Sequence, residues 1–302
     1  MLIMFSRKKQ DEYIQDLADA ARKKSRWLDI WRRLLRNKLG MVGLCIIVVL
    51  VLLIIFADVL AKQPYDMQVF TERWQYPSRA HILGTDELGR DLWSRMLHGG
   101  RISLMVAVLA VCISVSAGIV LGSTAGYFGG MTDIIITRIM EILMAVPGLL
   151  LAIAIAFALG QSPVNTAIAI STSGIPFSCR LIRATVMSLK SNEFVEAARA
   201  SGSKHFRVIF VHIIPNTIAP LIVNASLWVA GNIMAISGLS FIGLGVRPPT
   251  PEWGAILVAG RPYFRDFWPT ILFPSLFIAL TLFGFNLLGD GLRDALDPRL
   301  KD

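Results

Sequence analysis

The sequence predicts an all-α membrane protein whose chain crosses the bilayer six times. Its 302 residues are 54% hydrophobic and only 17% charged, whereas soluble domains carry roughly a quarter of charged residues. The apolar residues gather in runs comparable to the ~20 residues that span a bilayer core, and the basic residues gather between alternate runs. Composition, run length and charge distribution therefore indicate the same fold class.

The clearest span covers residues 39–61, with no charged residue between Leu39 and Phe56. This run and the polar segment before it are both too long for a signal peptide, so we expect an uncleaved first span. The other five expected spans cover residues 102–125, 134–159, 164–182, 217–239 and 270–288. The fourth and fifth of the six have the least continuous apolar stretches.

The basic residues predict which side of the membrane each connection faces. Roughly two thirds of the 30 Lys and Arg residues lie in residues 1–38, after the second span, in residues 183–216 and at the C-terminus. Since cytoplasmic loops accumulate Lys and Arg, we expect these segments and both termini in the cytoplasm. The same rule explains the net charge of +9 without nucleic acid as a partner, because the sequence carries no nucleic-acid-binding motif.

Two parts of the chain differ in composition. Residues 1–38 form a polar tail in which apolar residues recur at helical spacing among arginines, which is typical of an amphipathic helix on an anionic lipid surface. These apolar positions are Trp27, Trp31, Leu34 and Leu35. Residues 39–302 form the transmembrane domain, in which residues 190–216 are a polar cytoplasmic loop.

Between the first and second spans, the sequence predicts a short helix at the outer membrane surface. One face of this helix would be apolar and would hold Leu92, Trp93, Met96 and Leu97. Asp91 and Arg95 lie one turn apart on the other face, where we expect them to pair.

The second span carries small residues at a strict spacing of four, and these are Ser114, Gly118, Gly122 and Gly126. In lipid, such a stripe marks a close contact between helix backbones. The partner helix could belong to this chain or to another subunit.

The third expected span contains one carboxylate, Glu141, close to Arg138. Ionisable groups at membrane depth are costly and are often functional. Glu141 is therefore either a proton-coupling site or a structural partner of Arg138, which lies three residues before it. The structural role is favoured because Glu141 lies within about two helical turns of the expected interface.

The remaining polar residues predict no catalytic or metal site. Four histidines are scattered without metal-ligand spacing, and three cysteines in or beside apolar runs are expected to act as small hydrophobic residues. These residues are His81, His98, His205 and His212, and Cys45, Cys112 and Cys179. Because there is no phosphate-binding loop and no nucleophile motif, we expect a protein that is not an enzyme, binds no cofactor directly and does not hydrolyse ATP.

The most informative polar segment lies between the fourth and fifth spans. It reads Glu193-Phe194-Val195-Glu196-Ala197-Ala198-Arg199-Ala200-Ser201-Gly202 and continues to Pro215. The alanines predict a slim helix, Gly202 can end it with a sharp turn, and Pro215 interrupts the chain before the next span. Such a helix, projecting from a membrane domain, suits contact with a cytoplasmic partner.

This segment resembles the coupling motif of ABC importer permeases, in which Glu-Ala-Ala, three residues and Gly are followed by a late Pro. The general pattern has Ile three residues before that Pro, whereas this chain has a His, as is usual in the peptide and nickel branch of the family. The resemblance implies that the ATPase-coupling residues are Glu193, Glu196, Ala197, Ala198, Arg199, Gly202, His212 and Pro215.

Four further segments resemble the same branch, in particular its C-type permease subunits for dipeptides and oligopeptides. They cover residues 83–91, 126–130, 248–254 and 286–298. The resemblance extends from about Leu34 to the C-terminus.

The resemblance implies a permease of the bacterial cytoplasmic membrane that imports di- or oligopeptides by ATP-driven alternating access. Its partners would be a second homologous permease subunit, two ATPase subunits that use ATP and Mg, and an extracytoplasmic binding protein facing residues 62–101 and 246–269. Import of nickel or glutathione is the nearest alternative. A proton-coupled transporter using Glu141 and a non-transporting membrane scaffold are the others.

Overall fold

A computed structural model describes residues 28–296 of the chain, and this part is helical, with no strand apart from one isolated bridge between Thr85 and Asp91. Its longer helices are α2 (Lys38–Ile55), α4 (Leu92–Phe128), α5 (Gly130–Ala145), α6 (Gly148–Leu159), α7 (Pro163–Leu189), α10 (Ile214–Phe241) and α12 (Pro269–Leu296). The shorter ones are α3 (Ala57–Leu60), α8 (Glu193–Ala200), α9 (His205–Arg207) and α11 (Trp253–Gly260). The predicted all-α class is confirmed.

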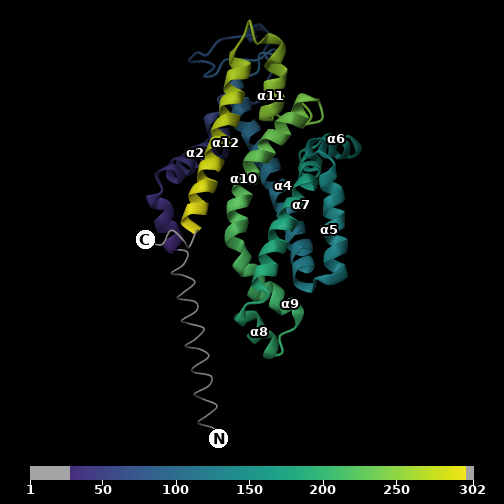
Figure 1. The fold of residues 1–302 in the computed structure, drawn as a ribbon. Coiled ribbons are helices and arrows are strands. Elements are labelled where there is room, and N and C mark those ends of the chain that lie inside the picture. The colour runs from purple at the N-terminus through teal and green to yellow at the C-terminus, as the bar shows by residue number, and fades with distance from the viewer. Residues whose placement is uncertain (1–27, 297–302) are drawn as a thin grey trace, which may run out of the picture.

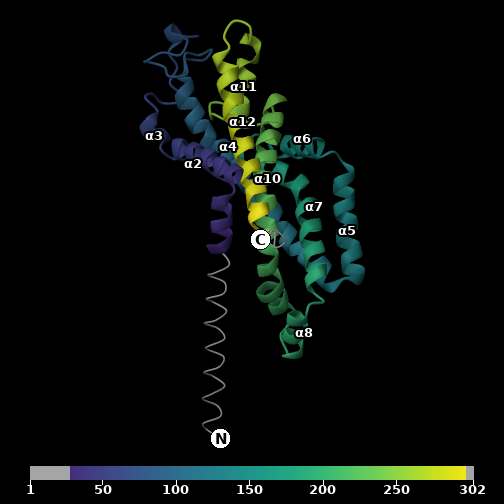
Figure 2. The same cartoon turned by 60° about the vertical axis from the view of Figure 1, so that its left-hand side comes forward.

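Helices α4, α5, α7, α10 and α12 share one general direction, and the short elements gather at its two ends (Figure 1). Helices α2 and α6 run at an angle to this direction (Figure 2). Helices α8 and α9 lie at one end, while the connection between α3 and α4 lies at the other, beside the start of α12. The tail expected over residues 1–38 falls largely outside the described residues, Trp27 included. Residues 28–36 are helical, with Trp31 and Leu35 exposed and Leu34 buried.

Four helical stretches in residues 28–296 are long and apolar enough to cross a membrane, namely α2, α4, α12 and the continuous run His205–Phe241 that contains α10. The third expected span is split into α5 and α6, which meet at 90° and together count as a fifth crossing at most. The break between α5 and α6 has a local cause. The proline ring of Pro147 disfavours a helical conformation in the residue before it, and Val146 is accordingly extended, with a ψ of 129°. Figure 2 shows α6 lying across the end of α5.

Helix α7 is less apolar than these stretches, although its 27 residues are long enough for a crossing. It carries many Ser and Thr residues and an internal Pro176. The count of six spans therefore stays a prediction. Of the two spans with the least continuous apolar stretches, the fifth lies in the run His205–Phe241 and the fourth, α7, is left open.

The predicted surface helix before the second span is wrong as a separate element. Its residues form the first turns of α4, a single helix of 37 residues. Leu92, Met96 and Leu97 are fully buried, so this apolar face packs against protein and not against the membrane surface.

The predicted pair of Asp91 and Arg95 is also not formed. Asp91 is the N-cap residue of α4 and accepts a hydrogen bond from the Ser94 backbone N–H at 2.8 Å, while its other oxygen contacts His81 Nδ1 at 2.9 Å. Arg95 Nε approaches Asp86 Oδ2 at 3.3 Å. A capping carboxylate must turn back toward its own backbone, which takes it away from the next turn.

The stripe of small residues in α4 packs against α7 of the same chain. A Cβ atom on Gly122 would lie 2.5 Å from the Cys179 carbonyl oxygen, which is closer than atoms can approach without rearrangement. At the first position of the stripe, the Ser114 hydroxyl donates to the Ser171 carbonyl at 2.9 Å. This seam joins the two helices backbone to backbone, as small residues permit in lipid.

A buried carboxylate, that of Glu252, joins α10, α11 and α4. Glu252 is 1% exposed and caps α11 by accepting hydrogen bonds from the Gly254 and Ala255 N–H groups, both at 2.8 Å. It also accepts from the Ser103 hydroxyl of α4 at 3.0 Å and the Ser240 hydroxyl of α10 at 2.7 Å. Four donors and the helix N-terminus compensate the loss of hydration of this charge.

We expect Gly122→Val to lower the free energy of unfolding by about 1–3 kcal/mol, because added side-chain atoms would force α4 and α7 apart. Unfolding of the purified protein in detergent measures this change. Gly231→Ala is the control, since a Cβ atom at Gly231 meets nothing within 4 Å. Equal stability of the Gly122 variant and the parent would contradict the close seam.

We expect Glu252→Ala to lower the free energy of unfolding by about 1–3 kcal/mol, because buried N–H and hydroxyl donors lose their acceptor. The same unfolding assay applies. Glu141→Ala removes a partly exposed ion pair and serves as the control, with an expected change below about 1 kcal/mol. If both variants are equally stable, Glu252 does not hold the three helices together.

Candidate functional site

The polar segment between α7 and α10 folds as a hairpin at one end of the molecule (Figure 1). Helix α8 is followed by Gly202, whose φ of +79° is readily adopted by glycine alone. The Gly202 N–H donates to the Arg199 carbonyl and the Ser203 N–H to the Ala198 carbonyl, which closes the helix end. After α9, a π-helical turn over Val208–Ile213 leads into α10. We call Glu193–Ile213 the coupling hairpin, after the motif that its sequence resembles.

Helix α8 has one anchored side and one free side. Val195 is fully buried and belongs to an apolar cluster with Val186 of α7 and Ile213, and Ala198 packs partly against the same cluster. The free side contains the exposed residues Glu193, Glu196 and Ala197, and Gly202 is exposed just beyond the end of the helix. Arg199 is exposed as well, but its guanidinium packs on the Tyr127 ring of α4. The sequence had grouped Ala198 with this surface, and the structure places it at the boundary.

The remaining two predicted site residues lie at the base of the hairpin. His212 is half-buried in the π-helical turn, and its carbonyl accepts a hydrogen bond from the Asn216 side chain at 2.7 Å. Pro215 lies in the first turn of α10, directly after the π-helical turn, where it has no N–H to donate to the preceding turn of the continuous helical run. Both residues shape the exit from the hairpin and do not extend its free side.

Tyr127, near the C-terminal end of α4, is a contact residue that sequence reasoning did not single out. It is buried, its hydroxyl lies 2.9 Å from His205 Nδ1, and the Arg199 guanidinium lies over its ring at 4.9 Å from the centroid. Cation–π contacts of this kind stabilise by about 0.5–2 kcal/mol. One side chain of α4 therefore touches both α8 and α9.

An ion pair and a hydrogen bond fix the neighbouring end of α7. The Arg183 guanidinium donates to both oxygens of Asp133 in α5, the second at 2.6 Å, and Lys190 Nζ donates to the Gly126 carbonyl of α4 at 3.2 Å. With Tyr127 and Val195, these contacts tie the hairpin region to α4, α5 and α7. A displacement of α8 would therefore be passed to the long helices.

Exposed aromatic residues extend the free surface of the hairpin. Phe206 is 71% exposed, and its ring lies 4.3 Å from the ring of Phe210, which is also exposed. Phe194 of α8 is exposed as well. Apolar side chains next to acidic ones at a protruding end are typical of a protein-binding surface.

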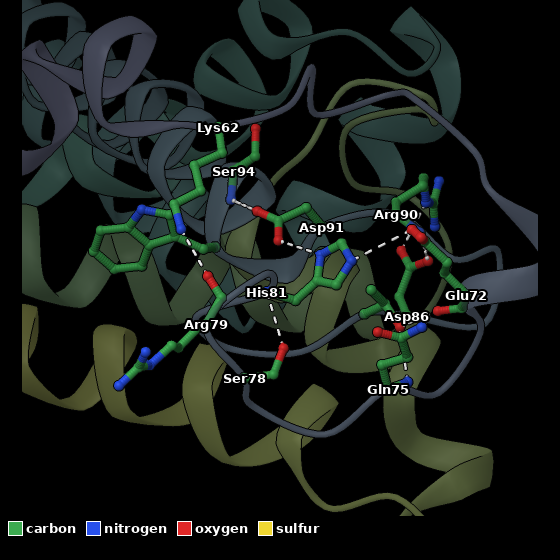
Figure 3. A network of polar contacts seen from close by, with 12 residues as sticks. Lys62, Glu72, Gln75, Ser78, Arg79, His81, Asp86, Arg90, Asp91 and Ser94 are labelled. Carbon is green, nitrogen blue, oxygen red and sulfur yellow. Dashed lines mark hydrogen bonds and ion pairs between the residues drawn. The ribbon is translucent and has the colours of Figure 1, made fainter.

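A second polar network lies at the opposite end, in the connection between α3 and α4 (Figure 3). His81 is buried between two carboxylates, with Nδ1 2.9 Å from Asp91 and Nε2 3.4 Å from Glu72. Asp86 accepts from Arg90 Nε at 2.6 Å. Three of these residues, Asp86, Arg90 and Asp91, belong to the motif at positions 83–91. That motif therefore encodes a local loop structure.

This connection joins the loop before α12 through aromatic contacts. The ring of Trp74 lies 4.2 Å from that of Tyr263 and 5.2 Å from that of Phe267. Tyr76 packs on Phe267 and donates its hydroxyl to the Asp266 carbonyl at 3.1 Å. We call residues 62–91 with 261–268 the outer platform, after the side of the membrane on which the charge distribution in the sequence predicts them.

Helix α3, which directly precedes the outer platform, is held to α4 by an exposed ion pair. Asp58 of α3 accepts hydrogen bonds from Arg101 and from His98 Nε2. The Arg101 hydrogen bond, followed by that of His98, lowers the pKa of the Asp58 carboxyl from its usual value, so Asp58 stays ionised at neutral pH.

The carboxylate in the third expected span is paired as its structural interpretation predicts. Arg138 donates to Glu141 at 2.7 Å, and both side chains are substantially exposed. Residues 28–296 contain no group of three or more His, Cys, Asp or Glu side chains placed to hold a metal ion.

The comparisons with protein families agree with the resemblance in the sequence. A family described as "Binding-protein-dependent transport system inner membrane component" matches residues 118–302. The "N-terminal TM domain of oligopeptide transport permease C" matches residues 25–77.

Curated relatives cover nearly the whole chain. It is 44% identical over 277 residues to the "Dipeptide transport system permease protein DppC" of Alkalihalophilus pseudofirmus, covering 92% of this chain and 91% of that protein. It is 40% identical over 278 residues to the "Glutathione transport system permease protein GsiD" of Pectobacterium atrosepticum, covering 91% and 92%. Among solved structures, the MetNI methionine ABC transporter in an inward-facing conformation has a TM-score of 0.54 at 14% identity, covering 68% of this chain and 98% of that chain. This last likeness concerns the fold.

We expect Tyr127→Phe to loosen the coupling hairpin, because it removes the hydrogen bond to His205 while keeping the ring. A hydrogen bond contributes about 1 kcal/mol, so amide hydrogen exchange in residues 193–207 should become about fivefold faster. Tyr263→Phe at the opposite end is the control and leaves this exchange unchanged. Unaltered protection of α8 and α9 in the Tyr127 variant would show that the contact does not hold them.

Proposed function

Because this chain belongs to the family of inner membrane components of binding-protein-dependent transport systems, we propose that it is the permease subunit of an ATP-driven importer of di- and oligopeptides. The observation that carries the proposal is the coupling hairpin: α8 is fixed on one side to α4 and α7 and free on the other. A subunit without an ATPase site of its own needs such a surface to receive force.

The partners follow from this division of labour. Two ATPase subunits, which use ATP and Mg, would bind on the cytoplasmic side, one of them at the free side of α8. This chain would bind neither ATP nor Mg itself. A second, homologous permease subunit would complete the pathway, and membrane lipid would surround the apolar faces of both. A binding protein would deliver cargo to the outer platform.

The proposed orientation places the coupling hairpin in the cytoplasm and the outer platform outside. The distribution of Lys and Arg supports it, and so does the position of the two features at opposite ends of the molecule (Figure 2). Helix α12 runs from the outer platform toward the hairpin side, in keeping with a cytoplasmic C-terminus.

The contacts of the hairpin suggest how motion is transmitted. When ATP closes the ATPase subunits, their grooves would displace α8 through its free side, where Glu196 and the exposed Ala197 lie. Val195 and Tyr127 would pass the displacement to the ends of α7 and α4. Because the seam of small residues locks these helices together, they would move as one body, and the pathway would open alternately to the two sides.

Among the candidate cargoes, peptides have better support than nickel. Dipeptide permeases of two organisms match at 44% and 40% identity over about nine tenths of the chain, and the alternative, glutathione, is itself a peptide-like compound. For nickel, the described residues offer no cluster of metal-binding side chains. The paired and exposed Glu141 does not favour the proton-coupled alternative.

We expect Glu196→Lys to reduce peptide uptake at least about tenfold, because a reversed charge on the free side of α8 opposes docking of the ATPase subunits; loss of one buried charge contact costs about 2–5 kcal/mol. ATP-dependent uptake of labelled dialanine is measured in proteoliposomes that contain the complete importer, together with co-purification of the ATPase subunits. Glu141→Gln is the matched control and leaves uptake unchanged. Uptake that survives Glu196→Lys but fails with Glu141→Gln or on collapse of a proton gradient would overturn the proposal.

A further inference from the structure

Residues 28–36 are helical and directly precede the first membrane span. This segment is held in place by its own side chains. Leu34 is buried, and a Cβ atom added to Gly291 of α12 would lie 3.3 Å from Leu34 Cδ1. The Asn37 side-chain NH₂ donates to Asp294 of α12 at 2.9 Å. Helix 28–36 therefore has a fixed place beside the start of α2 and the end of α12 (Figure 1).

One face of helix 28–36 is basic. Arg32, Arg33 and Arg36 follow one another at spacings that bring side chains together on one helix face. With Asp29 they line a common hollow of about 240 Å³, in which three positive charges meet one negative charge. Guanidinium groups bind phosphate oxygens through two parallel N–H donors. This face therefore suits a phosphate group.

The neighbouring face of the same helix is apolar and exposed. Leu28, Trp31 and Leu35 lie three and four residues apart, and all three side chains are exposed. The same spacing runs on into α2, where Leu39 and Val42 are exposed as well. Because α2 is long and apolar enough to cross a membrane, its exposed side chains contact lipid tails, and tryptophan is favoured at the membrane interface. A surface for hydrocarbon therefore adjoins the surface for phosphate.

We propose that helix 28–36 binds an anionic phospholipid, with the headgroup phosphate at the three arginines and an acyl chain along Trp31, Leu35 and the start of α2. The proposal goes beyond the proposed function and depends on it only for the orientation of the chain, which puts the site in the cytoplasmic leaflet. Anionic lipids give that leaflet its negative surface potential.

Other ligands match only part of this surface. Free phosphate would use the arginines and leave the apolar side chains in water. A zwitterionic lipid carries its own positive charge beside the phosphate, which competes with the guanidinium groups. An anionic phospholipid supplies a phosphate and a hydrocarbon chain in one molecule, in the order in which the basic hollow and the apolar residues meet the membrane. Because Leu34 and Asn37 tie the helix to α12, the bound lipid would also brace α2 against α12.

The first test measures lipid affinity. The full chain is purified in detergent, and binding of short-chain phosphatidylglycerol and of short-chain phosphatidylcholine is followed by native mass spectrometry. We expect the combined change Arg32→Gln, Arg33→Gln and Arg36→Gln to lower the affinity for phosphatidylglycerol at least about tenfold, since each basic residue near an anionic surface adds about fivefold. Lysine at the same three positions keeps the charge, and we expect a loss below about threefold. Unchanged affinity of the glutamine variant overturns the proposal.

The matched control removes the same number of arginines from the opposite end of the molecule, through Arg247→Gln, Arg261→Gln and Arg265→Gln. We expect this variant to bind phosphatidylglycerol as the parent does. An equal loss in both variants would mean that net charge alone attracts the lipid, which contradicts a site at helix 28–36. Inorganic phosphate in large excess should not displace the lipid, and displacement would contradict a lipid site.

The second test asks whether the acyl chain lies along Trp31. Phosphatidylglycerol brominated on its acyl chains quenches the fluorescence of tryptophans that it touches, so we expect the parent to lose more fluorescence than Trp31→Phe. Equal losses contradict the proposed chain position. In the complete importer, the glutamine variant should still co-purify with the ATPase subunits. Loss of co-purification with unchanged lipid affinity would assign the basic face to a partner protein. None of the lipid measurements uses cargo or ATP, so failure of the proposed peptide import is a separate outcome.

Discussion

The rest of the structure depends on the close contact between α4 and α7. In lipid, apolar surface gives little drive for helix association, so helices join where small residues let their backbones approach. At Gly122 the approach leaves no room for a methyl group. The two helices therefore behave as one body, with the coupling hairpin packed at one end and α10 facing them across a cavity of about 240 Å³. A change in the cavity requires movement of α10 relative to this pair.

Much of this arrangement could be predicted from the sequence, because it depends on local sequence patterns. Apolar runs predicted the helices, four-residue spacing predicted the stripe, and Glu196 to Gly202 predicted a short projecting helix that the structure confirms as α8. The errors arose where a residue interacts with another that is distant in the sequence. Asp91 was expected to pair within its helix, yet it caps the helix and contacts His81. The bend at Pro147 was hidden because both of its arms are apolar.

The contacts that matter most for the candidate site could not be predicted, since their partners lie far apart in the chain. Tyr127 and His205 are 78 residues apart, and Glu252 and Ser103 are 149 apart. A tyrosine among apolar residues, or a glutamate after a proline, carries no sign of such a partner. The cavity is a still weaker signal, because it is formed by the absence of side-chain volume at residues on three helices. Only the fold brings these positions together.

The length of α4 has a consequence for how the two faces of an importer communicate. At ~1.5 Å per residue, its 37 residues extend about 55 Å, well beyond a hydrocarbon core of about 30 Å. Its first turn is capped by the same aspartate that contacts His81 in the outer platform, and its last turn carries Tyr127 against the coupling hairpin. In the proposed assembly, a signal from a docked binding protein would need no relay of successive contacts, because both surfaces are attached to one continuous helix. By thermodynamic reciprocity, an effect of nucleotide at one end of that helix would be felt with equal coupling free energy by a protein bound at the other end.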